Sequence, residues 1–377
     1  MPLLEKLRLL GNAASWDSCG GVKQKNLRKA KIPASYSSFV YDCAASSEPC
    51  RLMKVLQSNS CIHDCKYCVN SACKSGKAEL APIELAKSFD SLQRQGYVEG
   101  LFLSSAVTGE ADKTAEKMIE SVRLLRQRFG FKGYVHLKVL PTMSKHLIFE
   151  MAELANRLSV NLETVSKSHW ETLGSTKDYL RDLQLRLLWL DEAKRKGRLT
   201  SFTTQLILGA AGETDLDVLE KMRWLYGNTL LHRTYFSAFQ PVKGTALEKK
   251  DGEKPLREYQ LYQSDWLLRK YGFKLNELKL GLNEENRFGN ARDIKHEIAL
   301  NNPNQFPIDV NSAGKEELLR VPGIGPKTAE KIIEEREQQG KRFHSMRELQ
   351  QAGAIARRAM PFVQIDGARQ AKLSAFC

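Results

Sequence analysis

The sequence predicts an α/β fold followed by a small all-α domain at the carboxyl end. Between residues 52 and 244, six short apolar runs alternate with longer amphipathic segments, which is the pattern of repeated strand and helix units. Two prolines then bound a short segment, residues 303–307, which is typical of a linker. Beyond this segment lie two short helical stretches joined by a glycine-containing turn, and a weaker copy of the same pattern.

Length and composition set limits on the function. The 377 residues can form a core-bearing domain and a smaller second one, and a hydrophobic content of 42% is ordinary for a globular protein. The formal net charge of +14 favours an anionic partner, nucleic acid first. We find no long apolar run and no charged leader with a small-residue cleavage site. We therefore expect a cytoplasmic protein without membrane segments, whose eight cysteines are metal ligands or free thiols rather than disulfides.

Residues 1–51 form a basic, cysteine-containing segment for which we expect a partly extended arm. Five basic residues within nine positions are either phosphate contacts or a solvated surface: Lys23, Lys25, Arg28, Lys29 and Lys31. Cys19, Cys43 and Cys50, together with Cys73, are a possible second metal site, and the alternative is that they are small buried side chains.

The elements of the α/β domain, residues 52–244, follow from hydrophobic periodicity. The expected strands are residues 52–56, 100–104, 134–140, 158–163, 202–208 and 233–239. The expected helices between them are residues 83–95, 111–129, 145–157, 177–196 and 216–226. This alternation fits a partly closed barrel or a doubly wound sheet equally well.

Three cysteines follow the first expected strand, in the stretch CIHDCKYC from Cys61 through Cys65 to Cys68. Thiolates packed this closely indicate zinc or an iron-sulfur cluster, and a zinc site would need His63 or Cys73 as its fourth ligand. A [4Fe-4S] cluster held by three thiolates instead keeps one iron open for an exogenous ligand. The C-x3-C-x2-C spacing, with Tyr67 before the last cysteine, resembles the signature of the radical S-adenosylmethionine (SAM) superfamily.

This resemblance implies a partial (β/α)6 barrel in which the open iron chelates SAM and an electron from the cluster cleaves SAM to a 5'-deoxyadenosyl radical. It also implies an external electron donor such as flavodoxin or ferredoxin. Because chemistry in parallel α/β folds sits at the carboxyl ends of the strands, we expect SAM contacts there. The candidates are Tyr67, Ser104, Ser105, Lys138, Glu163 and Gln205. No catalytic residue toward the substrate can be named from the sequence.

After the barrel, residues 245–302 are expected to form a helical extension at the barrel mouth, with a helix at residues 256–271. Residues 308–377 contain Val-Pro-Gly-Ile-Gly followed by Pro-Lys-Thr-Ala, which resembles the helix-hairpin-helix motif of DNA repair proteins. In such a turn, glycines let the backbone approach a phosphate and helix amides donate to it. The candidate nucleic-acid contacts are Gly323, Ile324, Gly325, Lys327 and Thr328, with Arg357 and Arg358 from the weaker repeat. The alternative is a hairpin that binds only protein.

Together these features resemble the family described as DNA modification or repair radical SAM proteins, in which a cysteine-bearing segment precedes the barrel. We therefore expect an enzyme that binds DNA without reading its sequence and applies radical chemistry to it. Two alternatives remain at this stage: a radical SAM enzyme that transfers methyl or thiomethyl groups to RNA, and a non-enzymatic iron-sulfur protein that binds DNA.

Overall fold

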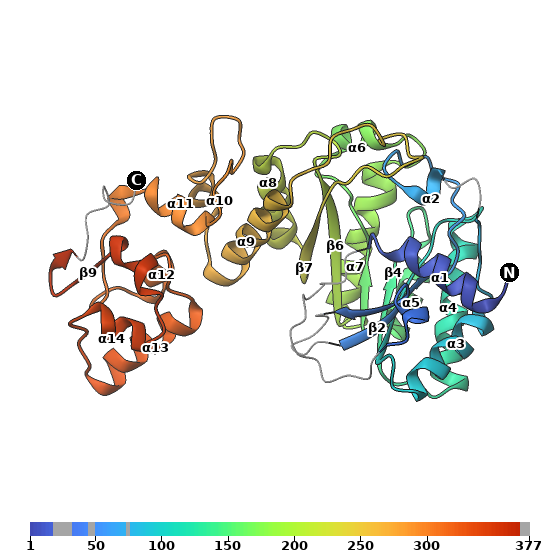
Figure 1. Ribbon diagram of the computed structural model, residues 1–377, viewed down its shortest axis with the longest axis horizontal. Helices are drawn as coiled ribbons and strands as arrows, with labels where there is room; N and C mark the ends of the chain where they lie inside the picture. Colours follow the sequence, from blue (N-terminus) through green and yellow to red (C-terminus); the bar gives the residue numbers. More distant parts are fainter. Residues whose placement is uncertain (18–31, 44–49, 73–75, 370–377) are drawn as a thin grey trace. The chain divides into compact units, whose positions relative to one another are not determined.

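The computed structural model describes residues 1–17, 32–43, 50–72 and 76–369 (Figure 1). The chain divides into two compact units. The first unit comprises Met1–Glu213 and Leu225–Glu253, and the second comprises Thr214–Trp224 and Lys254–Cys377. Each unit has its own hydrophobic core. None of the helices in the described ranges combines the length and the apolar character needed to cross a membrane.

The first unit is built on a curled, seven-stranded half-barrel sheet. Its strands are β1 (Val40–Cys43), β2 (Cys50–Leu56), β3 (Gly100–Ser104), β4 (Tyr134–Lys138), β5 (Arg157–Ser159), β6 (Ser201–Leu208) and β7 (Arg233–Ala238). Strands β2 to β7 are parallel, and β1 pairs antiparallel with β2 at one edge. The strand order follows the chain order without reversal. A doubly wound sheet requires such a reversal, so the partial barrel is confirmed and the doubly wound alternative is wrong.

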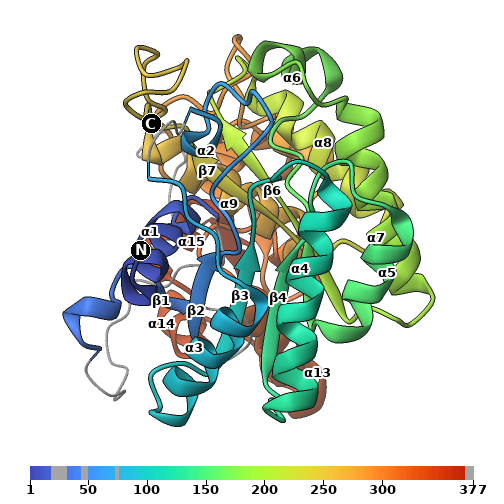
Figure 2. The ribbon, with the colours of Figure 1, turned by 90° about the vertical axis from the view of Figure 1, so that its right-hand side faces the viewer.

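Helices cover one face of this sheet, as Figure 2 shows for α3, α4, α5 and α7. The connecting helices are α3 (Pro82–Arg94), α4 (Ala111–Arg123) with its π-helical end η2 (Leu124–Arg128), α5 (Lys145–Leu154), α6 (Lys167–Leu173), η3 (Tyr179–Gln184) with α7 (Leu185–Arg195), and α8 (Asp215–Asn228). Each buries an apolar stripe; in α4 this stripe is Ala115, Met118, Ile119 and Val122. The crossovers therefore lie on one side of the sheet and leave its inner side for the site.

Two local differences from the sequence-based expectation have physical reasons. Residues 3–14 form helix α1 (Leu3–Ala14) rather than an extended arm, because Leu7, Leu10 and Ala14 recur at helical spacing and are buried. Strand β5 is shorter than the expected residues 158–163. The backbone leaves the sheet before Glu163, which has φ 66° and retains only an isolated bridge to β6.

The second unit combines the helical extension with the hairpin region. Its helices are the first part of α8, then α9 (Pro255–Tyr271), α10 (Leu275–Lys279), α11 (Ile294–Leu300), α12 (Lys315–Leu318), α13 (Pro326–Gln339), α14 (Met346–Gln351) and α15 (Ala356–Ala359). A three-stranded sheet that the sequence did not predict adds β8 (Ile308–Asp309), β9 (Val363–Ile365) and β10 (Ala368–Arg369). The short 3-10 helix Pro303–Gln305 lies where a linker was expected, and Phe306 next to it is buried in this unit's core.

The two helical hairpins pack against each other through their turns. Gly323 has φ +86°, and its carbonyl accepts a hydrogen bond of 2.9 Å from the Ile355 amide of the second hairpin. A Cβ at Gly323 would lie 2.8 Å from the Ile355 carbonyl oxygen, so glycine is required here by its conformation and by close packing. Leu318, Ile332, Leu349 and Phe362 are among the side chains of the shared core.

Candidate active site

One cavity in the first unit collects residues from loops at the carboxyl ends of the strands. Its free volume is about 180 Å³. All three motif cysteines and all six predicted SAM-contact residues line it: Cys61, Cys65, Cys68, Tyr67, Ser104, Ser105, Lys138, Glu163, Gln205. The parallel sheet explains this convergence, because its strands deliver their following loops to the same edge.

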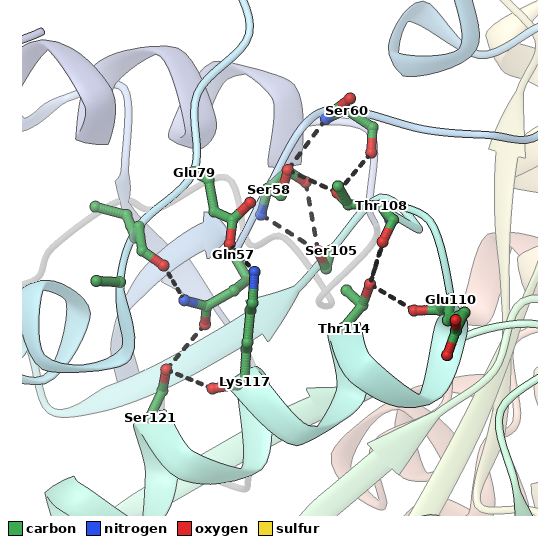
Figure 3. A network of polar contacts seen from close by, with 12 residues as sticks. Gln57, Ser58, Ser60, Glu79, Ser105, Thr108, Glu110, Thr114, Lys117 and Ser121 are labelled. Atoms are coloured by element: carbon green, nitrogen blue, oxygen red, sulfur yellow. Dashed lines mark hydrogen bonds and ion pairs between the residues drawn. The ribbon is translucent and has the colours of Figure 1, made fainter.

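The start of the cysteine loop is fixed to the loop after β3. The Thr108 hydroxyl lies 3.0 Å from the Ser58 hydroxyl and 2.9 Å from the Ser60 carbonyl, to which it donates (Figure 3). The Ser60 amide in turn donates to the Ser58 hydroxyl at 3.2 Å, and the Ile62 amide donates to the Val107 carbonyl at 3.0 Å. These contacts place Cys61 beside the loop that carries Ser104 and Ser105.

The middle of the loop is fixed to the segment after α6. The Asp64 carboxylate accepts hydrogen bonds from the amides and hydroxyls of Ser175 and Thr176, with distances from 2.6 to 3.1 Å. Burial opposes ionisation of Asp64, but these hydrogen bonds outweigh it and hold the pKa well below its usual range. The Lys66 amide also donates to the Leu173 carbonyl at 2.8 Å. The loop is therefore held from two sides by contacts that involve no thiol.

Two of the motif thiols, Cys65 and Cys68, lie in an environment that disfavours their charged form. Burial raises the pKa of Cys65, and burial together with the neighbouring Cys65 raises the pKa of Cys68 to about 12. Lys177 hydrogen-bonds to the Cys65 sulfur and carries the compensating charge. Burial opposes the charge of Lys177, yet the nearby Cys65 and Glu163 raise its pKa.

This donor set fits a cluster better than a single ion. Among the described residues, no three Cys, His, Asp or Glu side chains converge on one ion position. The three thiols nevertheless share one cavity, and a four-iron cluster is wide enough to reach ligands that one ion cannot. His63 also lines the cavity, with Nδ1 3.2 Å from the Thr176 hydroxyl and Nε2 buried without a hydrogen-bond partner in the described chain. Burial, with Lys177 nearby, lowers the pKa of His63 to about 4, so its imidazole is neutral.

Two predicted SAM-contact residues are already engaged by the N-terminal segment. Lys138 forms an ion pair with Asp17, and Gln205 donates from its side-chain amide to the Trp16 carbonyl at 3.2 Å. Burial acts to lower the pKa of Lys138, but the carboxylates of Asp17 and Glu163 outweigh this effect and raise the pKa. The charge of Lys138 is therefore paired within the protein by a residue that follows α1, and its contact with SAM stays a prediction.

Glu163 combines a left-handed backbone conformation with a buried carboxylate. Its φ of 66° turns the chain out of β5, while its amide donates to the Gln205 carbonyl at 3.0 Å and its carbonyl accepts from the Ile207 amide at 2.7 Å. The Tyr67 hydroxyl hydrogen-bonds to the Glu163 carboxylate. Burial raises the pKa of Glu163, and the charges of Lys138 and Lys177 oppose that rise. This carboxylate lines the cavity as a hydrogen-bond acceptor, and its contact with the ribose of SAM stays a prediction.

Ser104 and Ser105 have different surroundings in the loop after β3. Ser104 is buried, and its carbonyl accepts from the Gln57 amide at 2.8 Å. The Ser105 hydroxyl accepts from the Ser58 amide at 3.2 Å and lies 2.7 Å from the Ala106 carbonyl. The Ser105 hydroxyl therefore shapes the loop that faces the cysteines.

Sequence reasoning missed the ion partners Asp17 and Lys177. Asp17 lies outside the expected barrel, and Lys177 follows a short helix that the sequence did not predict. Neither residue stands in a recognisable motif. No pattern in the sequence indicates that they lie in the site, because tertiary packing alone brings them there.

The possible second metal site is only partly described. Cys43 is disulfide-bonded, so the expectation of metal ligands or free thiols is wrong for this residue, and Cys50 is its cross-strand neighbour. Cys19 and Cys73, like the basic residues from Lys23 to Lys31, lie outside the described residues.

Some of the predicted nucleic-acid contacts of the second unit are exposed, and others are buried or paired with groups of the protein. Lys327 and Arg357 are exposed, and Gly325 is the N-cap of α13 with no side-chain cap. In contrast, the Ile324 side chain is buried and its amide donates to the Val321 carbonyl at 3.1 Å. Arg358 forms an ion pair with Asp293, and the Thr328 hydroxyl donates to the Gly353 carbonyl at 3.1 Å.

Two family models match separate parts of the chain. Residues 55–225 match the model of the Radical SAM superfamily, and residues 303–360 match the model of the helix-hairpin-helix motif. Residues 55–225 therefore form a radical SAM domain, and residues 303–360 contain a helix-hairpin-helix motif. Radical SAM proteins use a [4Fe-4S] cluster and SAM, and the three cysteines that line the cavity fit such a cluster.

Solved structures of radical SAM enzymes are similar to part of the chain. A structure of methylornithine synthase (PylB) has 16% identity and a TM-score of 0.46, and covers 56% of this chain and 60% of its own. HydG, a maturase of the [FeFe]-hydrogenase, has 12% identity and a TM-score of 0.44, covering 56% and 48%. The radical SAM methyltransferase TsrM from Kitasatospora setae has 14% identity and a TM-score of 0.40, covering 51% and 37%. The chain thus spans 37 to 60% of the length of these structures. A search of curated proteins found no significant match.

Proposed function

We propose that this radical SAM enzyme modifies or repairs DNA in the cytoplasm, receiving its electron from a donor such as flavodoxin or ferredoxin. The observation that carries the proposal is the presence of a helix-hairpin-helix motif in the same chain as a radical SAM domain. This motif suggests nucleic-acid binding, and the radical SAM domain supplies the chemistry.

The start of α13 supports phosphate binding. Pro326 occupies the first helical position and Gly325 the N-cap, so no side chain of the cap competes for the free amides of the first turn. Such amides, at the positive end of a helix dipole, are suited to an anion. Lys327 in this turn and Arg357 on the second hairpin are exposed and add positive charge. Contacts of this kind bind the backbone without reading the base sequence.

In the first unit, the cysteines would hold the cluster and the surrounding residues would hold SAM. When bound, the reduced cluster supplies the electron that cleaves SAM to a 5'-deoxyadenosyl radical. Glu163 is placed to accept hydrogen bonds from a ribose, and its bond from Tyr67 fixes the carboxylate. Lys177 stabilises negative charge on the Cys65 sulfur. The apolar walls that include Val139 and Leu140 exclude water from a reactive radical.

The test is formation of 5'-deoxyadenosine by the anaerobically reconstituted enzyme with a chemical reductant, with and without duplex DNA. We expect cleavage in the wild type and its loss, together with loss of the cluster absorbance, in Cys61→Ala, Cys65→Ala and Cys68→Ala. The matched control is Cys50→Ala, which removes a cysteine of β2 outside the motif and the cavity and should keep SAM cleavage. Cleavage that survives any of the three motif substitutions contradicts the cofactor assignment.

A competition experiment tests the substrate class separately. Labelled duplex DNA bound to the enzyme is challenged with unlabelled duplex DNA or transfer RNA. Preferential displacement by transfer RNA would overturn the proposed DNA substrate and would favour an RNA-modifying enzyme, while the assay for SAM cleavage remains unaffected.

A further inference from the structure

The second unit contains an aromatic groove that the hairpin motif does not account for. Its volume is about 300 Å³, within the size range of small-molecule pockets. Tyr259, Tyr262 and Trp266 line it from one face of α9, since they are spaced by three and four residues. Tyr259 is 58% exposed and Trp266 is 47% exposed. Large aromatic side chains gathered on an exposed surface usually mark a binding site.

The groove adjoins the first hairpin turn. Lys295 lies under the groove, with its Nζ 4.6 Å from the centre of the Tyr271 ring and 2.7 Å from the Ile324 carbonyl oxygen, to which it donates. Tyr271 also lines the groove, and its hydroxyl lies 3.3 Å from the position of a Cβ on Gly325. A strand held by its phosphate at Gly325 would therefore have its next nucleotide beside the aromatic face.

The groove also contains charged groups that suit a base and its phosphate. Arg358, in α15 of the second hairpin, is ion-paired with Asp293, and both side chains line the groove. The Nε of Arg358 is buried and has no hydrogen-bond partner in the part of the chain that the structure describes. The Arg358 side chain as a whole is 40% exposed, so its guanidinium can donate to a base carbonyl, and the Asp293 carboxylate can accept from an exocyclic amine.

We propose that this groove binds an unpaired nucleobase of the DNA whose backbone the adjacent hairpin holds. The base stacks on Trp266 and Tyr259, while Arg358 and Asp293 face its polar edge. A nucleobase fits better than an apolar protein segment, because the groove combines flat π surfaces with hydrogen-bonding groups and adjoins the hairpin turn that precedes the exposed Lys327. The inference rests on the proposed DNA-binding function and adds to it a preference for DNA with an extrahelical base.

The experiment measures the affinity of the full-length enzyme for three fluorescent DNAs by anisotropy. They are a perfect duplex, the same duplex with one unpaired thymidine, and the same duplex with an abasic residue at the unpaired position. Because stacking of one base on aromatic side chains contributes about 1–3 kcal/mol, we expect the thymidine bulge to bind at least about fivefold more tightly than the perfect duplex. The abasic bulge should lose this gain, since it keeps the distorted backbone and lacks the base.

The variant Tyr259→Ala with Trp266→Ala should lose the preference for the thymidine bulge and keep the affinity for the perfect duplex. The matched control, Tyr259→Phe with Trp266→Phe, retains both rings and should keep the preference. Basal SAM cleavage and circular dichroism verify that each variant is folded. A preference that survives the alanine substitutions, or that extends to the abasic bulge, overturns the base-binding groove.

Two further outcomes separate this inference from the proposed function. Equal binding of all three DNAs by the wild type means that the hairpins hold DNA but the groove does not hold a base. Binding of none of them overturns the DNA-binding function and the groove assignment together.

Discussion

Lys177 is the residue that most directly modifies the cluster site, because it places a positive charge against the Cys65 sulfur. A reduced cluster carries more negative charge than an oxidised one, and a nearby cation stabilises it. We predict that Lys177→Met shifts the reduction potential of the cluster to more negative values. An anaerobic redox titration followed by electron paramagnetic resonance measures this shift.

Two variants control this experiment. Lys177→Arg keeps the charge and should shift the potential less, while Lys66→Met removes an exposed lysine of the same loop. An identical potential in Lys177→Met and the wild type would show that the lysine has no electrostatic role at the cluster.

Lys295 gives a pH dependence to the stability of the second unit. Burial, together with Arg358, lowers its pKa to about 7, below the value of about 10.4 expected in the unfolded chain. Above pH 7 the folded state releases this proton before the unfolded state does, so the contribution to stability rises with pH up to about pH 10. We predict that the free energy of unfolding of the wild type, minus that of Lys295→Met, increases by up to about 1.4 kcal/mol per pH unit in this window. Denaturant unfolding between pH 7 and 10 measures it, and a difference independent of pH would contradict the assignment.

At the scale of single residues, the sequence identified those site residues whose spacing or position along the chain indicates a chemical role. Cys61, Cys65 and Cys68 were found this way, and Glu163 was found because a carboxylate follows an apolar strand. The engagement of Lys138 by Asp17 could not be found, since 121 positions separate them and only the fold brings them together.

Among the elements, α8 shows how the second unit is held together. Its first residue, Asp215, forms a buried ion pair of 2.7 Å with Arg257 and also accepts from the Phe288 amide at 2.9 Å. We predict that Asp215→Ala destabilises the second unit by about 3–5 kcal/mol, because it leaves the Arg257 charge buried without its partner. Denaturant unfolding monitored by circular dichroism at fixed pH measures the loss.

The same helix offers the control. Glu220 pairs with Lys279 at 3.3 Å, and both side chains are about half exposed. Glu220→Ala should therefore change stability by at most about 1 kcal/mol. Equal effects of the two substitutions would show that burial of the Asp215 pair does not matter.

Elements with a strong periodic pattern could be predicted, and the others could not. The residues of β3 and of α4 with η2 follow apolar spacing and were expected within one residue. The short sheet of β8, β9 and β10 was missed, because strands of two or three residues carry no period. Helix α1 was overlooked because the basic residues that follow it dominate the composition of the first fifty positions.

For the whole molecule, the net charge of +14 and the exposed hairpin residues predict a DNA affinity that falls steeply as the salt concentration rises. Each phosphate contact contributes about 0.9 to the slope of log affinity against log salt concentration. We predict that Lys327→Ala with Arg357→Ala reduces this slope by about 1.8 on duplex DNA, whatever its sequence. Binding measured over a salt series gives the slope.

SAM cleavage without DNA should be unchanged in this double variant, because both side chains lie in the second unit and none of the cavity residues does. An unchanged slope would place the DNA contacts elsewhere in the chain. These exposed positions are better probes than Gly323, whose substitution would disturb the packing of the second hairpin against the turn.

The way the cysteine loop is fastened has a consequence for how the holoenzyme is made. Hydrogen bonds of Ser58, Thr108 and the Asp64 carboxylate hold the loop without any contact to a thiol, so we expect the loop to keep its shape when iron is lost. The cluster would then be inserted into a preformed site, and the loop would not need to fold around the metal. Protein that has lost its iron to air should accept a new cluster without refolding, and a delivery protein need only reach the loop.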